Sequence, residues 1–275
     1  MRRALLALLC LGGLPLLSQC SDAGVCALGH GPSPAQNQLR FTGQWGRSGS
    51  PDDLTFQAGR FDGRFLLGDR AALIAVVPFG RVSGPQGATT GLGDAILALE
   101  ATLHRGSLGK VIVQAGARLA TGKDDAKGLP QRYQLGLGST DPILGVRLDA
   151  DTWDAGLGYQ RASSRSGNRL QPLKRGDDLL VHAGFRSSLG GYPVSLQALA
   201  IQRLGKSDIR LPDGSLQVLP DTDRLQVNLV GGLSIPLSRA WAMEGRVALP
   251  LLKRPDNTDG LKRALSLEWG ISYRF

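Results

Sequence analysis

The sequence lacks any long apolar run beyond its N-terminal region. Past that region, none of the 275 residues belong to a stretch of about 18 apolar residues, so no helix of the mature chain is expected to cross a membrane. A lipid-embedded chain without such helices must form a closed β-barrel, because only closure pairs every backbone N–H and C=O group. The neutral mean hydropathy of −0.07 fits strands with one lipid face and one polar face.

Cysteine is scarce, and all three cysteines lie before residue 27. Cys20 and Cys26 either leave with an export signal or remain and pair in an oxidising periplasm. Lipid attachment to Cys20 is a third possibility. A metal site built from Cys20, Cys26 and His30 would lack a convincing fourth ligand. We therefore expect no metal and no cofactor.

The N-terminus carries the pattern of an export signal. Arg2 and Arg3 precede the apolar stretch Ala4–Leu17, and small residues permit cleavage after Ala23 or as late as Ala27. The expected organisation is a signal peptide at 1–23, an N-terminal periplasmic segment at 24–36 and an outer-membrane barrel at 37–275.

The C-terminal stretch alternates apolar and polar residues up to its last position. From 261 to 275, most odd positions are Leu, Trp, Ile, Tyr or Phe, whereas most even positions are polar or small. This period of two is typical of a strand with one apolar face and one polar, solvent-exposed face. The spacing of Glu268, Gly270, Tyr273 and Phe275 resembles the C-terminal signal that the barrel assembly machinery recognises in outer-membrane proteins.

Similar segments recur along the chain and predict about twelve strands, an even number typical of bacterial single-chain barrels. The predicted strands are 37–46, 54–67, 70–81, 91–104, 109–121, 131–148, 151–163, 177–188, 192–205, 222–236, 239–251 and 261–275. Pro78 has no backbone N–H, so it must lie where no hydrogen bond from that position to a neighbouring strand is needed. The alternation changes parity at Asp141-Pro142, which predicts a β-bulge there.

The connections between these segments alternate between short and long. Short connections fall near 68–69, 105–108, 149–150, 189–191 and 237–238, and long ones at 47–53, 82–90, 122–130, 164–176, 206–221 and 252–260. This alternation predicts an all-β fold, a transmembrane up-and-down antiparallel barrel in a Gram-negative outer membrane. The alternative is a soluble β-sandwich or lipocalin-like barrel, whose apolar face would point inward.

Three short motifs occur in order between residues 91 and 141. Gly91-Leu92-Gly93-Asp94, Arg118-Leu119-Ala120-Thr121-Gly122-Lys123 and Gly136-Leu137-Gly138-Ser139-Thr140-Asp141 resemble elements of the outer-membrane transporter family named for the meta-pathway of phenol degradation. In the second motif, Ala120 replaces the proline of that family. The resemblance implies an outer-membrane channel for small, often hydrophobic or aromatic, compounds.

The polar parity of the strands is expected to line the interior. Its charged members are candidate selectivity residues: Arg40, Asp94, Glu100, Arg118, Arg132, Arg147, Asp154, Asp178, His182, Arg186, Arg224, Glu244, Arg246, Lys262 and Glu268. They either form ion pairs that stiffen the wall or set the selectivity of a pore. A barrel of about twelve strands predicts a narrow or partly plugged lumen. The net charge of +9 indicates either a charged lumen with loops that face anionic lipopolysaccharide, or a field that favours anionic solutes.

Two other functions compete with a channel. A lipid-acting enzyme would need a serine beside His104 or His182, and no such partner is evident. A structural or adhesive barrel would bind a partner through the 206–221 loop. We expect no enzymatic activity and no catalytic residue. The expected partners are outer-membrane lipid, lipopolysaccharide, the assembly machinery and an unidentified small solute, with no nucleic acid.

Overall fold

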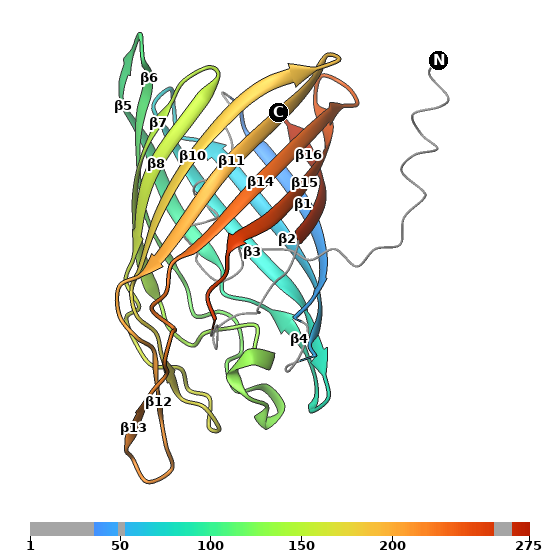
Figure 1. Cartoon of the computed structure of the whole chain (residues 1–275). Coiled ribbons are helices and arrows are strands. Elements are labelled where there is room, and N and C mark those ends of the chain that lie inside the picture. Colours follow the sequence, from blue (N-terminus) through green and yellow to red (C-terminus); the bar gives the residue numbers. More distant parts are fainter. Residues whose placement is uncertain (1–35, 49–52, 256–265) are drawn as a thin grey trace.

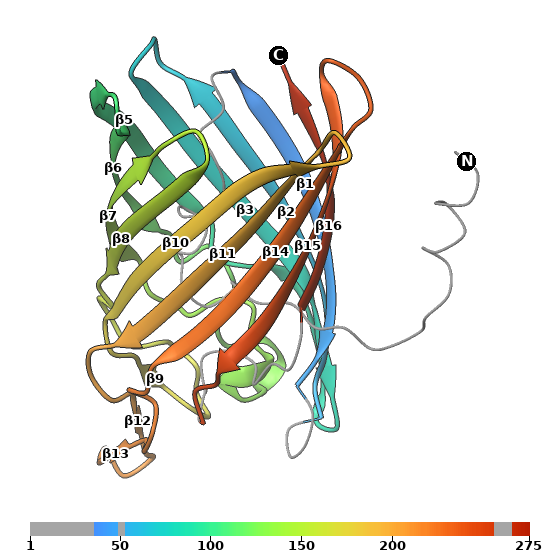
Figure 2. The same ribbon diagram turned by 45° about the horizontal axis from the view of Figure 1, so that its top comes forward.

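Twelve antiparallel strands form a closed barrel in a computed structural model that describes residues 36–48, 53–255 and 266–275 (Figure 1, Figure 2). The strands of the wall are β1 Gln38–Arg47, β2 Thr55–Leu66, β3 Ala71–Gly84, β5 Ile96–Gly106, β6 Gly109–Arg118, β7 Asp141–Asp149, β8 Trp153–Gln160, β10 Asp178–Leu189, β11 Tyr192–Arg203, β14 Gln226–Pro236, β15 Trp241–Leu252 and β16 Ser266–Arg274. Pairing of β1 with β16, from Gln38↔Arg274 to Trp45↔Leu267, closes the ring and leaves no free edge.

The connections confirm the predicted alternation. Short turns join the strands at the end of the barrel that lies uppermost in Figure 1, and the long connections gather at the opposite end. We call these the turn end and the loop end. In bacterial barrels the short turns face the periplasm, so the loop end faces outward. No helix in the described ranges is long and apolar enough to span a membrane.

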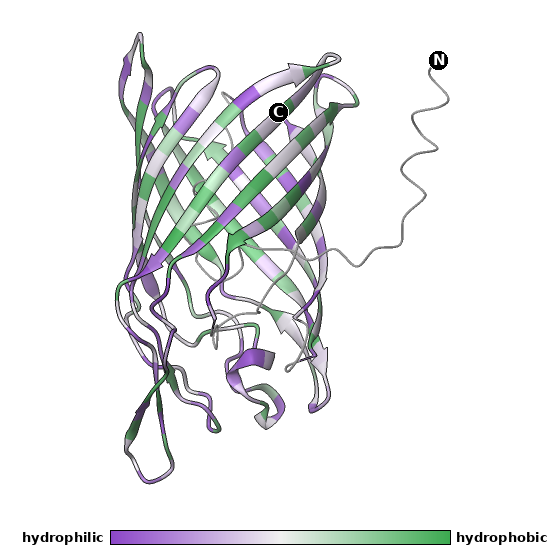
Figure 3. Ribbon diagram, viewed as in Figure 1, coloured by the Kyte–Doolittle hydropathy of each residue, from purple (hydrophilic) through white to green (hydrophobic). Residues whose placement is uncertain are grey.

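Apolar and polar residues alternate along the strands (Figure 3), and the outer wall of the barrel is apolar, as predicted. Leu157, Val181, Leu196 and Leu249 are each about half exposed, and they lie among many other exposed aliphatic side chains. Aromatic rings also lie outside: Phe41, Phe61, Phe79 and Trp269 form one group on β1, β2, β3 and β16. An apolar surface of this extent is stable only in contact with lipid, so the soluble alternative is wrong.

The predicted bulge at Asp141-Pro142 is wrong. The register between β6 and β7 runs without a break from Lys110↔Asp149 to Arg118↔Asp141. Residues 131–140 lie outside the wall and include the 3₁₀ turn η3, Gln131–Tyr133. The parity changes because β7 begins at Asp141. The apolar residues before it belong to the connection and therefore do not follow the alternation of the strand.

The predicted strand 91–104 also begins later than expected, at Ile96. Gly91 and Leu92 belong to a short extra strand, β4 Gly87–Leu92, which pairs with the loop-end part of β3. Pro78 lies where β3 changes partner, between Val76↔Ile96 and Phe79↔Leu92. Its missing N–H therefore breaks no ladder bond on that side, in agreement with the expectation for proline in a strand.

Candidate functional site in the barrel interior

The first group of interior charges lies on β1, β2, β15 and β16. The Arg40 guanidinium lies 3.0 Å from a Glu244 oxygen and 2.9 Å from a Glu268 oxygen. Arg246 is looser, at 3.7 Å from Glu244 and 3.6 Å from Glu268, beyond the usual length of a hydrogen bond. Arg60 lies 3.9 Å from Glu268. Arg60 also pairs with Asp62 of β2 at 2.7 Å. Three arginines therefore face three carboxylates, and the charges of this group balance.

A second group centres on Glu100 of β5. Its carboxylate lies 2.9 Å from Arg64 and 3.6 Å from Arg147, and it accepts a hydrogen bond of 2.9 Å from the Gln114 amide. Glu100 and Arg147 are buried. Because a buried carboxylate is stable only when paired and hydrogen-bonded, this group ties β2, β5, β6 and β7 together across their inner faces.

A third group lies nearer the loop end, around the fully buried Asp141. Asp141 forms an ion pair with Arg118 and accepts hydrogen bonds from the Gln160 amide at 3.1 Å and the Ser163 N–H at 3.0 Å. Arg175 lies 3.9 Å away. Asp141 thus joins the wall to the connection that follows β8.

Asp94 lies beside this group, in the connection between β4 and β5. It accepts hydrogen bonds from the backbone N–H groups of Gly122 at 3.1 Å and Leu137 at 2.8 Å. Burial raises the pKa of the Asp94 carboxyl above its usual value, although Arg118 and these hydrogen bonds oppose the shift. Asp94 therefore holds both ends of the 119–140 connection.

A fourth group surrounds Asp178 at the loop end of β10. Asp178 lies 3.1 Å from Arg175 and 3.1 Å from Arg203 of β11, and Arg254 is 3.9 Å away. Arg203 is among the largest fully buried side chains in the described residues. Three arginines around one carboxylate leave positive charge in excess in this group.

His182 and Arg186 of β10 share Asp154 of β8. The distances to Asp154 are 3.3 Å from His182 and 3.1 Å from Arg186, and Arg186 also lies 2.8 Å from Asp149. Gly156 makes room for the imidazole, since an added Cβ would lie 2.4 Å from His182 Cε1. Glycine on this inner wall therefore permits the close approach of a lumen side chain.

The interior also contains an apolar layer, which the alternation of the strands did not predict. Seven buried side chains that share the inward parity form one cluster: Val76, Ile96, Ala98, Ile143, Leu180, Leu199 and Ile201. They come from β3, β5, β7, β10 and β11, and β3 and β11 are on opposite sides of the twelve-membered ring. A layer of this kind excludes water from that level of the barrel.

The connection 119–140 folds into the loop end of the barrel. Tyr133 of η3 packs against Leu54, Phe56 and Val82, and Leu129 and Leu135 border the same cluster. Figure 1 shows this green connection beneath the strands, inside the ring of loops. We call this connection the plug; the expectation of a narrow or partly plugged lumen stays a prediction.

The connection 161–177 holds this plug in place. The Asn168 amide donates to the Leu129 carbonyl at 2.9 Å and to the Asp124 carbonyl at 2.8 Å. The Gln131 N–H donates to Gln171 at 3.2 Å. The connections 119–140 and 161–177 therefore support each other at the loop end.

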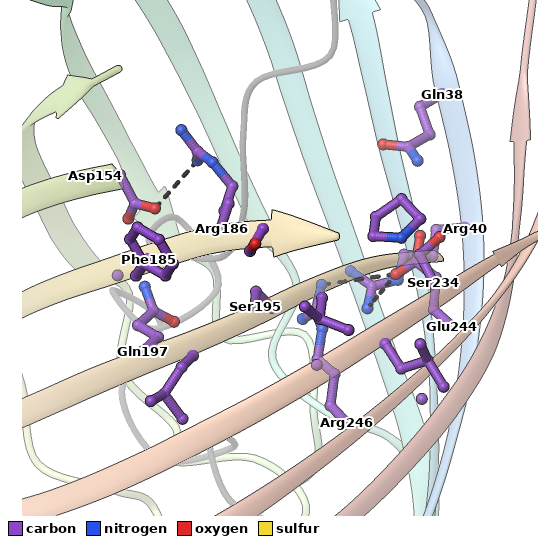
Figure 4. Close-up of a pocket in the computed structure, with 18 of the residues that line it drawn as sticks. Gln38, Arg40, Asp154, Phe185, Arg186, Ser195, Gln197, Ser234, Glu244 and Arg246 are labelled. Carbon is purple, nitrogen blue, oxygen red and sulfur yellow. Dashed lines mark hydrogen bonds and ion pairs between the residues drawn. The ribbon is translucent and has the colours of Figure 1, made fainter. Parts of the chain in front are cut away.

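A cavity of about 590 Å³ occupies the turn-end side of the lumen (Figure 4). Its lining extends to Gln38 and Arg274, which lie at the turn end. Figure 4 shows Arg186 beside Asp154 on one side, and Arg40 with Glu244 and Arg246 on the other. Among its charged lining residues are four arginines and two acids: Arg40, Arg186, Arg246, Arg274, Asp154 and Glu244.

Most of the predicted lumen residues lie on the inner faces of the wall strands, whereas Asp94, Arg132 and Arg224 lie in connections. Arg132 lies in η3, within the plug and not on a strand. Arg224 is exposed on the loop before β14 and pairs with Asp221 at 2.9 Å, so its predicted lumen position is wrong. Lys262 falls outside the described residues, as do the predicted signal peptide and the three cysteines.

Several interior charges were missed at the sequence level. They are Arg60, Arg64, Asp141, Asp149, Arg175, Arg203 and Arg254. Arg60 and Arg64 share the parity of the inward positions of β2, so the strand pattern contained the signal for them. Arg175 and Arg254 lie in connections, where no periodicity indicates direction. In the part of the chain that the structure describes, no three potential metal ligands come together.

The comparisons with known proteins concern the fold. No protein-family model and no curated protein matches the chain. It is similar to the COG4313 outer membrane channel from Pseudomonas putida F1, with 16% identity over 90% of this chain and 98% of that chain and a TM-score of 0.65. It is also similar to the NanC porin, with 10% identity over 86% of this chain and 100% of that chain and a TM-score of 0.53.

These likenesses, together with the apolar wall, show the fold of an outer-membrane β-barrel. At such low identities they establish the fold alone. The resemblance to the transporters of phenol degradation remains a prediction.

Proposed function

We propose that this chain is a gated outer-membrane channel for small solutes, with a preference for anions that carry a hydrophobic or aromatic body. The observation that carries the proposal is the lumen cavity of about 590 Å³ at the turn end. Concave sites of this size accommodate small organic molecules. A barrel that served only as a scaffold would have no need of such a space.

The charge of the cavity supports the preference for anions. Arg246 has no short ion pair to its neighbours Glu244 and Glu268, and Arg274 is exposed at the rim. These two guanidinium groups are available to a carboxylate, which they bind in a bidentate geometry. Rings of arginine and lysine are the usual basis of anion selectivity in pores.

The apolar layer supports passage of an apolar body and also supplies the gate. Leu199 lies two residues from the cavity residue Gln197 on the inner face of β11, a rise of about 7 Å along the strand. A solute held in the cavity is therefore next to this layer. In the closed state the layer and Tyr133 block further movement, so opening requires rearrangement of the side chains of the layer as well as displacement of the 119–140 connection.

Planar-bilayer recording with a salt gradient tests the proposal. We expect rare openings with an anion-selective reversal potential, and uptake of benzoate into liposomes that exceeds uptake of benzylammonium. The double variant Arg246→Gln and Arg274→Gln should lower the anion-to-cation permeability ratio about threefold or more, because two lumen charges are lost.

The control for this variant is Arg81→Gln with Arg210→Gln, which removes the same charge from exposed loop-end positions. It should leave the permeability ratio unchanged. A folded barrel that passes neither ions nor either aromatic probe would refute the channel, and equal uptake of the two probes would refute the preference for anions.

A further inference from the structure

A second cavity lies on the outside of the barrel, at the loop end of β11, β14 and β15. It measures about 650 Å³, and we call it the basic cleft. Its lining consists of Gln202, Lys206, Asp221, Asp223, Arg224, Leu225, Leu252, Lys253 and Pro255. The connections after β11 and after β15 form its two sides. None of these residues belongs to the interior groups described above.

The basic cleft has a fixed frame. The Gln202 amide donates to the Asp223 carbonyl at 2.7 Å, and the Ser207 N–H donates to the Thr222 hydroxyl at 2.8 Å. From the inner side, Arg254 Nε donates to the Arg224 carbonyl at 3.1 Å. The backbone that carries the cations of the cleft is therefore held before any ligand arrives, which lowers the entropic cost of binding.

Three cations face two acids in the cleft. Arg224 is oriented by Asp221 at 2.9 Å, and both side chains are largely open to solvent. Lys206 and Lys253 are exposed. In residues 36–48, 53–255 and 266–275, no acid lies within ion-pair distance of either lysine. Their ammonium groups thus have hydrogen-bond donors to offer to a ligand.

The position of the cleft relative to the apolar wall indicates the ligand. Leu225 and Leu252 line the cleft itself, and the neighbouring Leu204 and Leu251 are exposed. The cations therefore lie where the lipid-facing wall meets the loop end. In a membrane this is the level of the lipid headgroups, where long basic side chains reach anionic groups from an apolar surface.

We propose that the basic cleft binds the phosphorylated headgroup of a glycolipid in the outer leaflet. Lys206, Arg224 and Lys253 contact the phosphate, and Leu225 and Leu252 contact the first acyl carbons. This site is independent of the lumen and of solute passage. Its occupant would fix the β11–β14 connection against the membrane and so stabilise the folded barrel.

Native mass spectrometry of the full chain in detergent tests the proposal. The probes are bisphosphorylated lipid A, the same lipid without its phosphates, and inorganic phosphate. The wild-type barrel should retain one bisphosphorylated lipid A. The variant Lys206→Gln, Arg224→Gln and Lys253→Gln should bind this lipid about a hundredfold more weakly, because each of the three basic residues contributes about 1 kcal/mol to anionic-lipid binding.

The matched control is Arg81→Gln, Arg161→Gln and Arg210→Gln, which removes three charges from exposed loop-end positions outside the cleft. Its affinity for the lipid should equal that of the wild type, and circular dichroism should show a folded barrel for both variants. Equal affinity of the cleft variant and the wild type would overturn the proposal. So would equal binding of the dephosphorylated lipid, or inorganic phosphate bound as tightly as the lipid.

Bilayer conductance of the cleft variant should not change, so this result is separate from the outcome for the channel.

Discussion

Buried ion pairs hold the interior of the barrel at the scale of single residues. Each of the acids Glu100, Asp141 and Asp178 faces arginines from more than one strand or connection. A buried charge without a partner is far more costly than a pair, so these groups act as sets. The arrangement links the stability of the wall to the charge that a solute would meet.

The Arg118–Asp141 pair offers a test at this scale. Arg118→Met should lower the free energy of unfolding by about 3 kcal/mol, because it leaves the Asp141 carboxylate buried with the more distant Arg175 as its remaining cation. The double variant Arg118→Met and Asp141→Leu should lose much less. Urea unfolding from lipid vesicles, followed by tryptophan fluorescence, measures both variants and Asp141→Leu alone. A double-variant loss equal to the sum of the two single losses would show that the pair is not coupled.

At the scale of elements, the 119–140 connection is tied to the loop end at several points. The Gln86 N–H donates to the Tyr133 hydroxyl at 3.1 Å, and the Lys127 ammonium donates to the Ala88 carbonyl at 2.8 Å. Asp94 accepts two further hydrogen bonds from the connection. Under the proposed function, this is the element that must be displaced for the channel to open, and loss of its contacts should favour opening.

The variant Tyr133→Ala tests this gate. Removal of a ring that is 2% exposed leaves a cavity beside Leu54, Phe56 and Val82, and it should weaken the plug by about 3–5 kcal/mol. We expect more frequent openings in planar-bilayer recordings and no change in ion selectivity. Tyr192→Ala removes the same ring from the exposed outer wall and should leave the openings unchanged; an equal effect of both variants would argue against a gate at Tyr133.

At the scale of the whole molecule, closure of the barrel depends on its last strand. β16 pairs with both β1 and β15, and the Phe275 N–H donates to the Asn37 carbonyl at 3.1 Å. Tyr273 lies between Trp241 and Phe275, with ring centroids at 4.7 Å and 5.6 Å. The residues of the predicted assembly signal thus lie at the seam where first and last strands meet.

The variant Phe275→Ala separates assembly from stability. We expect the folded fraction in outer membranes to fall severalfold, whereas refolding into detergent micelles should change little, since Phe275 is exposed and its loss opens no cavity. The folded fraction is measured by the heat-dependent mobility of the barrel on gels. Phe185→Ala removes an equally exposed ring from the middle of the wall and should not impair assembly. An equal loss of folded protein in cells and in micelles for Phe275→Ala would contradict the role of Phe275 in the predicted assembly signal.

Residue order alone predicts the barrel. Alternation with period two and the regular change from short to long connections depend only on local residue order, so this order is sufficient to locate all twelve wall strands. The same alternation placed Arg40, Glu100, Arg147 and Glu244 on the inner wall, because a strand in lipid must turn its charges inward.

The tertiary structure alone decided what fills the barrel. Leu180 and Leu199 share the parity of the charges around them, and no local pattern reveals that they meet Val76 across the ring. The direction of Arg132 and Arg224 depends on how their connections fold, which periodicity does not govern. Local residue order is sufficient for the wall, because every strand has one face toward lipid and one face toward the interior. The plug, the gate and the basic cleft arise from contacts between segments that are distant in the chain.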